Sequence, residues 1–338
     1  MDWRNCKVLV TGGASFIGSH LVDTLVKKGA RVRVVDNLNS GKIDNIIGHI
    51  VENRIEFQKA DLLDPQISRK AMQDIRFVFH LAADHGGRGY VDLHQVACST
   101  NLILDGLVFK SAYESGVEKV VFASSACVYP NYLQSDPDEE IYLSEDMVKP
   151  PYDADNMYGW AKLMGELSLK AYHKEHGLKA VSCRYFTVYG PLGVENHAVI
   201  AMIARAFIGQ NPFEVWGDGT QLRNWTYVDD IIRGTILAAE KIDDGTAVNL
   251  GSMERVKVID AVRTVLKFTK HRAKIQFFPN MPTGPLNRVA DNKLAKKLLG
   301  WEPQVLFQEG LRRTIDWYFS TKDREQVRMI LKRMLMER

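Results

Sequence analysis

The sequence has few cysteines, and none of them lies close to another. The four thiols are spread over the 338 residues, at Cys6, Cys98, Cys127 and Cys183. This spacing excludes a CxxC metal site and a disulfide-rich scaffold, so we expect reduced thiols and no metal site. Each cysteine must therefore be judged by its own surroundings.

Long apolar runs and a dominant charge are also missing. No stretch reaches the roughly 18 apolar residues of a membrane span, and the apolar run near the N-terminus is too short for a signal peptide. The 44 Lys and Arg residues nearly balance the 41 Asp and Glu residues, which leaves a formal net charge of +3. We therefore expect a cytoplasmic protein that binds neither nucleic acid nor a membrane.

Short β-branched runs alternate with longer amphipathic segments through the first half of the chain. The runs are KVLVTG, RVRVVD, RIEFQKAD and FVFHLAA, and the first amphipathic segment covers about residues 19–28. This alternation predicts an α/β fold with a Rossmann-type, doubly wound parallel sheet. Two longer helices are predicted over about residues 97–115 and 157–176.

Proline and glycine punctuate the second half, in YGPLG, GQNPF and MPTGPLN. This change predicts two parts, an NAD-binding Rossmann domain and a smaller α/β substrate-binding lobe. We expect the first over residues 1–178, joined by about 222–250. The second should cover mainly residues 179–338.

The strand KVLV runs directly into TGGASFIGSHLV, in which Gly12 and Gly18 lie six residues apart at the opening of a helix. Glycines there permit a tight turn on which a pyrophosphate rests against the helix N-terminus. Asp36, 18 residues beyond Gly18, ends the next strand and would accept hydrogen bonds from the adenosine ribose. Its carboxylate would repel a 2′-phosphate, which predicts NAD rather than NADP. The alternative is an ordinary aspartate at a strand end.

Tyr158 and Lys162 occur in YGWAK, four residues apart and therefore on one face of a helix. A lysine ammonium near the phenol, with the positive nicotinamide close by, would lower the pKa of the tyrosine, so that it takes a proton from a sugar hydroxyl while hydride leaves for NAD. Together with the glycine turn, Asp36 and a serine after the preceding strand, this pair is a specific signal.

The chain resembles the extended short-chain dehydrogenase/reductase family of nucleotide-sugar epimerases and dehydratases over almost its whole length. The matching stretches are TGGASFIG, HLAAD, SSACVYP, YGWAK, RYFTVYGP, WGDGTQLRNWTYVDD, VNLGS and LGWEP. The resemblance implies that Ser125, Tyr158 and Lys162 form the hydride-transfer group. It also implies a nucleotide-diphosphate sugar as substrate and a homodimer through the two long helices.

The resemblance extends to the residues expected around the two ligands. For NAD these are Gly12, Ser15, Phe16, Ile17, Gly18, Asp36, Asp61, Leu62, Ala82, Ala83, Tyr158 and Lys162. For the substrate they are Gly87, Arg88, Ser125, Thr187, Asn196, Arg223 and Arg288, of which Arg223 and Arg288 would hold the diphosphate bidentately. Ser15 stands where the family usually has a glycine, and Asp61 also suits an ordinary turn.

Cys127 helps to distinguish between the reactions that members of this family catalyse. In the family's 4,6-dehydratases the positions of Ser125, Ala126 and Cys127 resemble Thr-Asp-Glu, which supply an acid and a base. Here the acid is replaced by Ala126, which argues against dehydration, whereas a thiolate at Cys127 retains a base for carbon deprotonation beside a 4-keto group. The glycine-rich AADHGGRGY is similar to the same loop of GDP-mannose 3,5-epimerases. The alternative is that Cys127 only supports the turn at Tyr129.

Two departures leave other readings open. His197 stands where the 3,5-epimerases are expected to have a lysine, and histidine exchanges protons near neutrality. Thr187 stands where those enzymes carry asparagine and some UDP-sugar 4-epimerases carry threonine. The resemblance therefore favours a GDP-mannose 3,5-epimerase-like enzyme that works through a transient 4-keto sugar. The first alternative is a UDP-glucose or UDP-glucuronate 4-epimerase; a 4,6-dehydratase and a non-catalytic NAD-binding protein are weaker ones.

Overall fold

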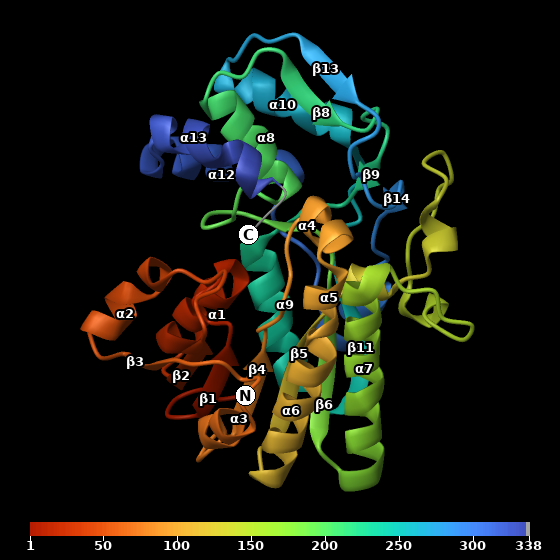
Figure 1. The fold of residues 1–338 in the computed structure, drawn as a ribbon. Helices are drawn as coiled ribbons and strands as arrows, with labels where there is room; N and C mark the ends of the chain where they lie inside the picture. The colour runs from red at the N-terminus through yellow and green to blue at the C-terminus, as the bar shows by residue number, and fades with distance from the viewer. Residues whose placement is uncertain (336–338) are drawn as a thin grey trace.

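Seven parallel strands form the central sheet of the computed structural model, which describes residues 1–335. Their order is β11-β6-β5-β4-β1-β2-β3, so the chain reverses direction across the sheet between β1 and β4. Ligands of doubly wound folds bind at the carboxyl ends of the strands near such a reversal. The sheet confirms the predicted Rossmann-type α/β fold (Figure 1).

The strands of this sheet are short and mostly buried, as expected for parallel strands covered on both faces. They are β1 (Lys7–Thr11), β2 (Arg31–Asp36), β3 (Ile55–Lys59), β4 (Phe77–His80), β5 (Lys119–Ser125), β6 (Lys179–Tyr185) and β11 (Asp244–Leu250).

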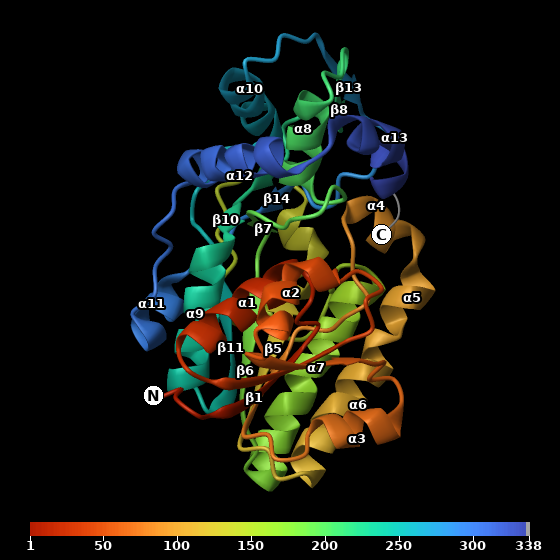
Figure 2. The same ribbon diagram turned by 90° about the vertical axis from the view of Figure 1, so that its left-hand side faces the viewer.

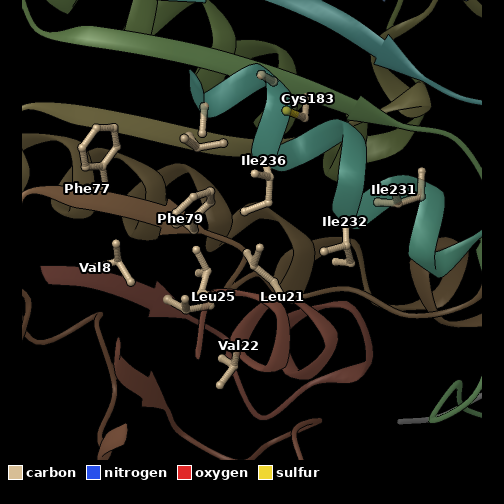
Figure 3. Close-up of a cluster of buried hydrophobic side chains, with 14 of the residues drawn as sticks. Val8, Leu21, Val22, Leu25, Phe77, Phe79, Cys183, Ile231, Ile232 and Ile236 are labelled. Atoms are coloured by element: carbon tan, nitrogen blue, oxygen red, sulfur yellow. The ribbon is translucent and has the colours of Figure 1, made fainter. Parts of the chain in front are cut away.

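Helices cover both faces of the sheet (Figure 2). On one face lie α1 (Phe16–Lys27), α2 (Ile47–Val51), α9 (Val228–Lys241) and α11 (Lys293–Leu299). On the other lie α3 (Pro65–Ala71), α6 (Asn101–Glu114) and α7 (Asn156–His176). Figure 3 shows the core on the first face, where Leu21 and Leu25 of α1 meet Ile232 and Ile236 of α9.

The prediction of one long helix over about residues 97–115 is wrong in one respect, because the structure has two helices there. Helix α5 (Gln95–Ser99) ends at Ser99, and α6 begins at Asn101, with Thr100 between them. The cause is the Asn101 side chain, which is buried and bonds to the backbone of Asp84 in both directions, at 2.6 and 2.8 Å. These bonds fix the start of α6 against the loop that precedes α4 (Arg88–Leu93).

The second lobe lies beyond the carboxyl ends of the strands (Figure 1). Its helices are α8 (Ala198–Phe207), α10 (Val258–Thr269), α12 (Phe307–Thr321) and α13 (Arg324–Met334). Its strands are β7 (Val188–Tyr189), β8 (Phe213–Trp216), β9 (Leu222–Arg223), β10 (Thr226–Tyr227), β12 (Val256–Lys257), β13 (Ile275–Phe278) and β14 (Asn287–Arg288). A separate apolar core, which includes Trp225 and Tyr318, holds this lobe together.

We propose the division into a cofactor lobe and a substrate lobe on this architecture. The chain enters the second lobe after β6 and returns to the sheet through α9 and β11, so residues 179–185 belong with the sheet. Among residues 1–335, no helix is long and apolar enough to cross a membrane.

Candidate active site

A cavity of about 400 Å³ lies between the two lobes. Its wall runs from the glycine turn of the sheet lobe, past the end of β5 and the start of α7, to α8, β8 and α10. Fifteen of the predicted residues contribute to it: Ser15, Phe16, Ile17, Ala83, Gly87, Arg88, Ser125, Cys127, Tyr158, Lys162, Thr187, Asn196, His197, Arg223 and Arg288. Residues far apart in the sequence therefore meet at one place.

The turn between β1 and α1 fits a dinucleotide. Gly12 has φ +68°, and a Cβ on Gly18 would lie 2.1 Å from the Gly12 oxygen, so both positions require glycine. The hydroxyl of Ser15 donates to the Gly12 oxygen at 2.6 Å and makes no cap bond to the helix. Ser15 is therefore compatible with the turn. The first N–H groups of α1 are available to bind an anion such as a pyrophosphate.

Asp36 is buried at the end of β2, beside this turn. One carboxylate oxygen accepts from the Ala14 N–H at 2.9 Å and the other from the Leu38 N–H at 2.8 Å. Burial raises the pKa of Asp36, against the effect of these two bonds. Asp36 thus ties the turn to β2, in addition to the ribose contact that we propose for it.

The two predicted residues after β3 have different surroundings. Asp61 is exposed and accepts from the Leu63 N–H within its own turn, at 2.9 Å. The side chain of Leu62 is buried in the core between the sheet and α6. Contacts of this pair with an adenine stay a prediction, in which Leu62 would contribute only backbone atoms.

Ser125, Tyr158 and Lys162 come together at the carboxyl end of β5. A hydrogen bond from Ser125 favours the ionised phenol of Tyr158, yet burial, together with the negative charges of Cys127, Asp105 and Cys98, raises the pKa of Tyr158 overall. The lowering that the sequence predicts, by Lys162 together with a bound nicotinamide, concerns the NAD complex and stays a prediction. The Lys162 ammonium lies 5.8 Å from the centre of the Tyr158 ring, and burial lowers its own pKa. NAD, when bound, would supply a hydride acceptor and a positively charged ring beside this phenol.

A row of buried, hydrogen-bonded polar side chains leads from Thr11 through His80 to Asp105, whose charge acts on Lys162. The Thr11 hydroxyl accepts from the N–H groups of Leu81 and Ala82, both at 3.1 Å, so it donates its own proton to Nδ1 of His80 at 2.7 Å. His80 therefore donates from Nε2 to Asp105, at 2.9 Å. The negative charge of Asp105 opposes the lowering of the Lys162 pKa by burial.

Cys127 lies in a short 3₁₀ turn directly after β5, Ala126–Val128. Its N–H donates to the Ser125 hydroxyl oxygen at 3.1 Å, and Nη1 of Arg288 donates to its sulfur at 3.3 Å. A Cβ on Gly159 would lie 2.2 Å from the Cys127 oxygen, so α7 approaches this turn at a distance that only glycine allows. The thiol thus stands beside Tyr158 with a cation on its sulfur.

Three arginines surround the carboxylate of Asp155 and the middle of the cavity. Arg88 and Arg288 both form ion pairs with Asp155, at 2.8 and 2.9 Å. Burial tends to raise the pKa of Asp155, but the charges of Arg288 and Arg88 hold it below its usual value. Burial, Arg288 and Arg88 together lower the pKa of Arg223 to about 9. Asp92 also forms an ion pair with Arg88, so two carboxylates face three arginines. Positive charge therefore remains in excess here, and an anionic ligand would balance it.

His197 directly precedes α8 and lines the cavity from the second lobe. Its ring lies 6.4 Å from the ring of His85, and a Cβ on Gly87 would lie 1.7 Å from the Asn196 oxygen. The loop before α4 and the loop before α8 are thus in close contact. Burial lowers the pKa of His197 to about 4, so the expectation of proton exchange near neutrality is wrong for the protein without substrate.

Thr187 lines the cavity between β6 and β7, and its carbonyl oxygen accepts from the Thr226 N–H.

The sequence analysis missed four residues of this region, which are His80, His85, Asp105 and Asp155. The most important of them is Asp155, which forms ion pairs with two arginines far from it in the chain. Asp155 directly precedes α7, where an aspartate has the pattern of an ordinary helix cap, yet its side chain makes no cap bond. Its separation of 67 residues from Arg88 and 133 from Arg288 left no local pattern to find.

The fold and this site define an NAD-dependent enzyme of nucleotide sugars. A family model described as "NAD dependent epimerase/dehydratase family" matches residues 8–251, and the chain belongs to that family. The chain is 32% identical over 334 residues to GDP-mannose 3,5-epimerase of Arabidopsis thaliana, covering 96% of this chain and 85% of the relative. It is 33% identical over 318 residues to UDP-glucuronate 4-epimerase of Thermodesulfobacterium geofontis, covering 91% of this chain and 95% of the relative.

A solved structure agrees with this assignment. UDP-glucuronic acid 4-epimerase of Bacillus cereus, in complex with UDP-glucuronic acid and NAD, matches with a TM-score of 0.83 and 31% identity. The match covers 94% of this chain and all (100%) of that chain. These findings confirm the predicted family and NAD as its cofactor.

Proposed function

We propose that this protein is a nucleotide-sugar epimerase that acts through a transient 4-keto sugar and inverts the carbons beside the ketone, as a GDP-mannose 3,5-epimerase does. The observation that carries the proposal is the position of Cys127, whose sulfur accepts from Arg288 while its turn packs against Gly159, next to Tyr158. A thiol in such a position serves as a base at carbon.

In the proposed reaction Tyr158 accepts the proton of the C4 hydroxyl, and Ser125 hydrogen-bonds the same oxygen. NAD, when bound beside Tyr158 and Lys162, would supply the acceptor for the C4 hydride and the source of its return. The ketone acidifies the hydrogens on C3 and C5, and Cys127, as a thiolate, removes one of them. Ala126 is buried and has no ionisable group, so the acid that a dehydratase needs for its leaving hydroxyl is missing at this position.

His197 is proposed to act on the opposite face of the sugar. Its lowered pKa of about 4 makes it a neutral imidazole before the substrate binds. An anionic substrate in the same cavity would raise this pKa toward neutrality, because a nearby negative charge favours the protonated ring. On this account His197 becomes a proton donor only in the substrate complex.

The arginines Arg88, Arg223 and Arg288 are proposed to face the diphosphate. Their excess positive charge around Asp155 supports this role. Arg288 would then contact both the substrate and Cys127, which couples the position of the sugar to the position of the base. Gly87 and Asn196 would shape the cavity wall beside them.

The second candidate is a UDP-glucose or UDP-glucuronate 4-epimerase. Thr187 in the cavity wall and the neutral His197 favour it, since inversion at C4 needs a rotated ketone and no base at carbon. Cys127 would then have only a structural role.

We also propose a homodimer through α5, α6 and α7. Large apolar side chains are exposed along these helices, with Val96 at 82%, Ile103 at 60% and Met164 at 46% of their area accessible. Covering them would remove apolar surface from water.

The experiment that tests the function is incubation of the NAD-loaded protein with GDP-mannose, UDP-glucose and UDP-glucuronate in heavy water, followed by NMR of the sugars. Deuterium at C3 or C5 is expected for the 3,5-epimerase. Inversion at C4 without deuterium at carbon would support the second candidate instead.

A further inference from the structure

The buried carboxylate of Asp105 has an oxygen that the proposed chemistry does not use. Asp105 lies on α6 and is 2% exposed, and its Oδ1 accepts from Nε2 of His80 at 2.9 Å. Within residues 1–335, its second oxygen, Oδ2, is buried without a hydrogen-bond partner. Buried polar atoms are almost always paired, so a carboxylate oxygen left over in the core calls for a positively charged neighbour.

Lys162 is the buried cation that matches this oxygen. It lies on α7 and is 1% exposed, and its Nζ also lacks a hydrogen-bond partner among residues 1–335. The buried carboxylate of Glu166, one turn further along α7, is already engaged, because it pairs with Arg184 at 2.7 Å and accepts from the Ser124 hydroxyl. The oxygen of Asp105 therefore remains as the negative neighbour of Lys162.

Gly165 brings these two groups to the same face of α7. Helices α6 and α7 pack side by side (Figure 1). A Cβ on Gly165 would lie 3.3 Å from Oδ2 of Asp105 and 2.6 Å from the ring of Phe122, so this oxygen faces α7 at the glycine. Lys162 is three residues earlier on the same face, and its Nζ lies 4.6 Å from the centre of the Phe122 ring. The oxygen and the ammonium thus lie around one aromatic ring.

The attraction between the two charges acts across a buried space of low dielectric constant. Burial lowers the pKa of Lys162, and the charge of Asp105 opposes this lowering. His80 adds no positive charge, because burial lowers its pKa as well. The other titratable groups of this region are a phenol and two thiols, at Tyr158, Cys98 and Cys127. Asp105 is thus the negative charge that favours the protonated form of Lys162.

We propose that Asp105 is a positioning residue of the hydride-transfer group, which holds Lys162 in its protonated form. The hydrogen bonds from Thr11 to His80 and from His80 to Asp105 keep the carboxylate in place. Without the charge on Lys162, the ionised phenol of Tyr158 would lose the cation that favours it. The inference rests on the proposed role of Lys162 and is independent of which sugar the protein converts.

The test is a pH titration by NMR of the NAD-loaded protein, labelled with carbon-13 at the ε-carbons of its lysines. The signal of Lys162 is the one that disappears in Lys162→Arg. In Asp105→Asn, Lys162 is expected to lose its proton at lower pH than in the wild type, because the effect of burial is no longer opposed. Asp105→Ser is a second neutral variant with the same expected shift. An unchanged midpoint in either variant would overturn the assignment.

Two further variants separate the charge from packing. His80→Gln disturbs the same buried row but keeps the carboxylate, so Lys162 should titrate close to the wild-type pH. Asp74→Asn removes the same charge from an exposed position and should also leave the titration unchanged. An equal shift of Lys162 in His80→Gln and Asp105→Asn would show that packing and not charge is responsible, and would overturn the assignment.

Turnover gives a second readout. With a nucleotide sugar that the wild type converts, the alkaline fall in kcat should move to lower pH in Asp105→Asn, while KM stays unchanged. The NMR titration needs no sugar, so the two proposals fail separately. An unchanged Lys162 midpoint with normal turnover would contradict the role of Asp105 and leave the epimerase proposal standing. A shifted midpoint in a protein that converts no nucleotide sugar would support the role of Asp105 and contradict the epimerase proposal.

Discussion

Nη1 of Arg288 lies 3.3 Å from the sulfur of Cys127, while Nη2 of the same guanidinium pairs with Asp155 at 2.9 Å. One side chain thus links the proposed base to the buried carboxylate that organises the arginines. A guanidinium in this place offers a positive partner to a negatively charged sulfur. The position of Cys127 therefore depends on Arg288, which is 161 positions away in the chain.

Asp155→Asn is expected to lower the free energy of unfolding by about 3 kcal/mol, because it leaves Arg288 buried beside a neutral group and leaves Arg88 only its ion pair with Asp92. The pKa of Asp155 is held below its usual 3.8, so its contribution is fully present above that pH and is lost as the pH falls below it. Denaturant titrations should show the gap between wild type and variant shrinking under strongly acidic conditions. A gap that stays constant with pH would contradict this role.

Gly159→Ala is expected to destabilise the protein by about 1–3 kcal/mol and to reduce turnover, because its Cβ would lie 2.2 Å from the Cys127 oxygen. The matched control is Gly48→Ala in α2, where a Cβ meets nothing within 4 Å. That change should stabilise the protein by about 0.5–1 kcal/mol through the lower entropy of the unfolded chain. Thermal unfolding of both variants checks the pair, and equal effects would show that the approach of α7 to Cys127 is unimportant.

His197→Gln is expected to flatten the dependence of stability on pH between about 6.5 and about 4. In this window the unfolded chain takes up a proton on His197 while the folded protein does not, so wild-type stability falls as the pH falls. Below about 4 both states are protonated and no further loss occurs. Denaturant titrations above pH 6.5 and near pH 4 measure the difference, and parallel profiles of the two proteins would refute the lowered pKa.

Asp36→Ala is expected to weaken NAD retention and to cost about 1–3 kcal/mol of stability, because the N–H groups of Ala14 and Leu38 lose their acceptors. The cofactor content of the purified protein and its thermal unfolding are the two readouts. Normal NAD content together with normal stability would show that the turn does not depend on this carboxylate.

The sequence predicted the parts of the site that follow local patterns. The glycine turn, Ser125 at a strand end and the spacing of Tyr158 and Lys162 each depend on a few neighbouring residues, and the parallel sheet brings strand ends to one edge. The break at Thr100 was missed because it depends on Asn101 bonding to Asp84, 17 residues earlier. The lowered pKa of His197 was missed because its burial depends on the contact of the loop before α8 with the loop before α4, which no local pattern records.

The central claim is that Cys127 removes a proton from carbon, and Cys127→Ser in heavy water tests it most directly. A serine hydroxyl is far too weak an acid to supply an alkoxide near neutral pH, whereas Ser125, Tyr158 and Lys162 remain for hydride transfer. With GDP-mannose the variant should accumulate reduced cofactor and place almost no deuterium at C3 or C5, while Tyr158→Phe should show neither. Wild-type deuterium incorporation and epimerisation by Cys127→Ser would contradict the account and leave the thiol a structural role.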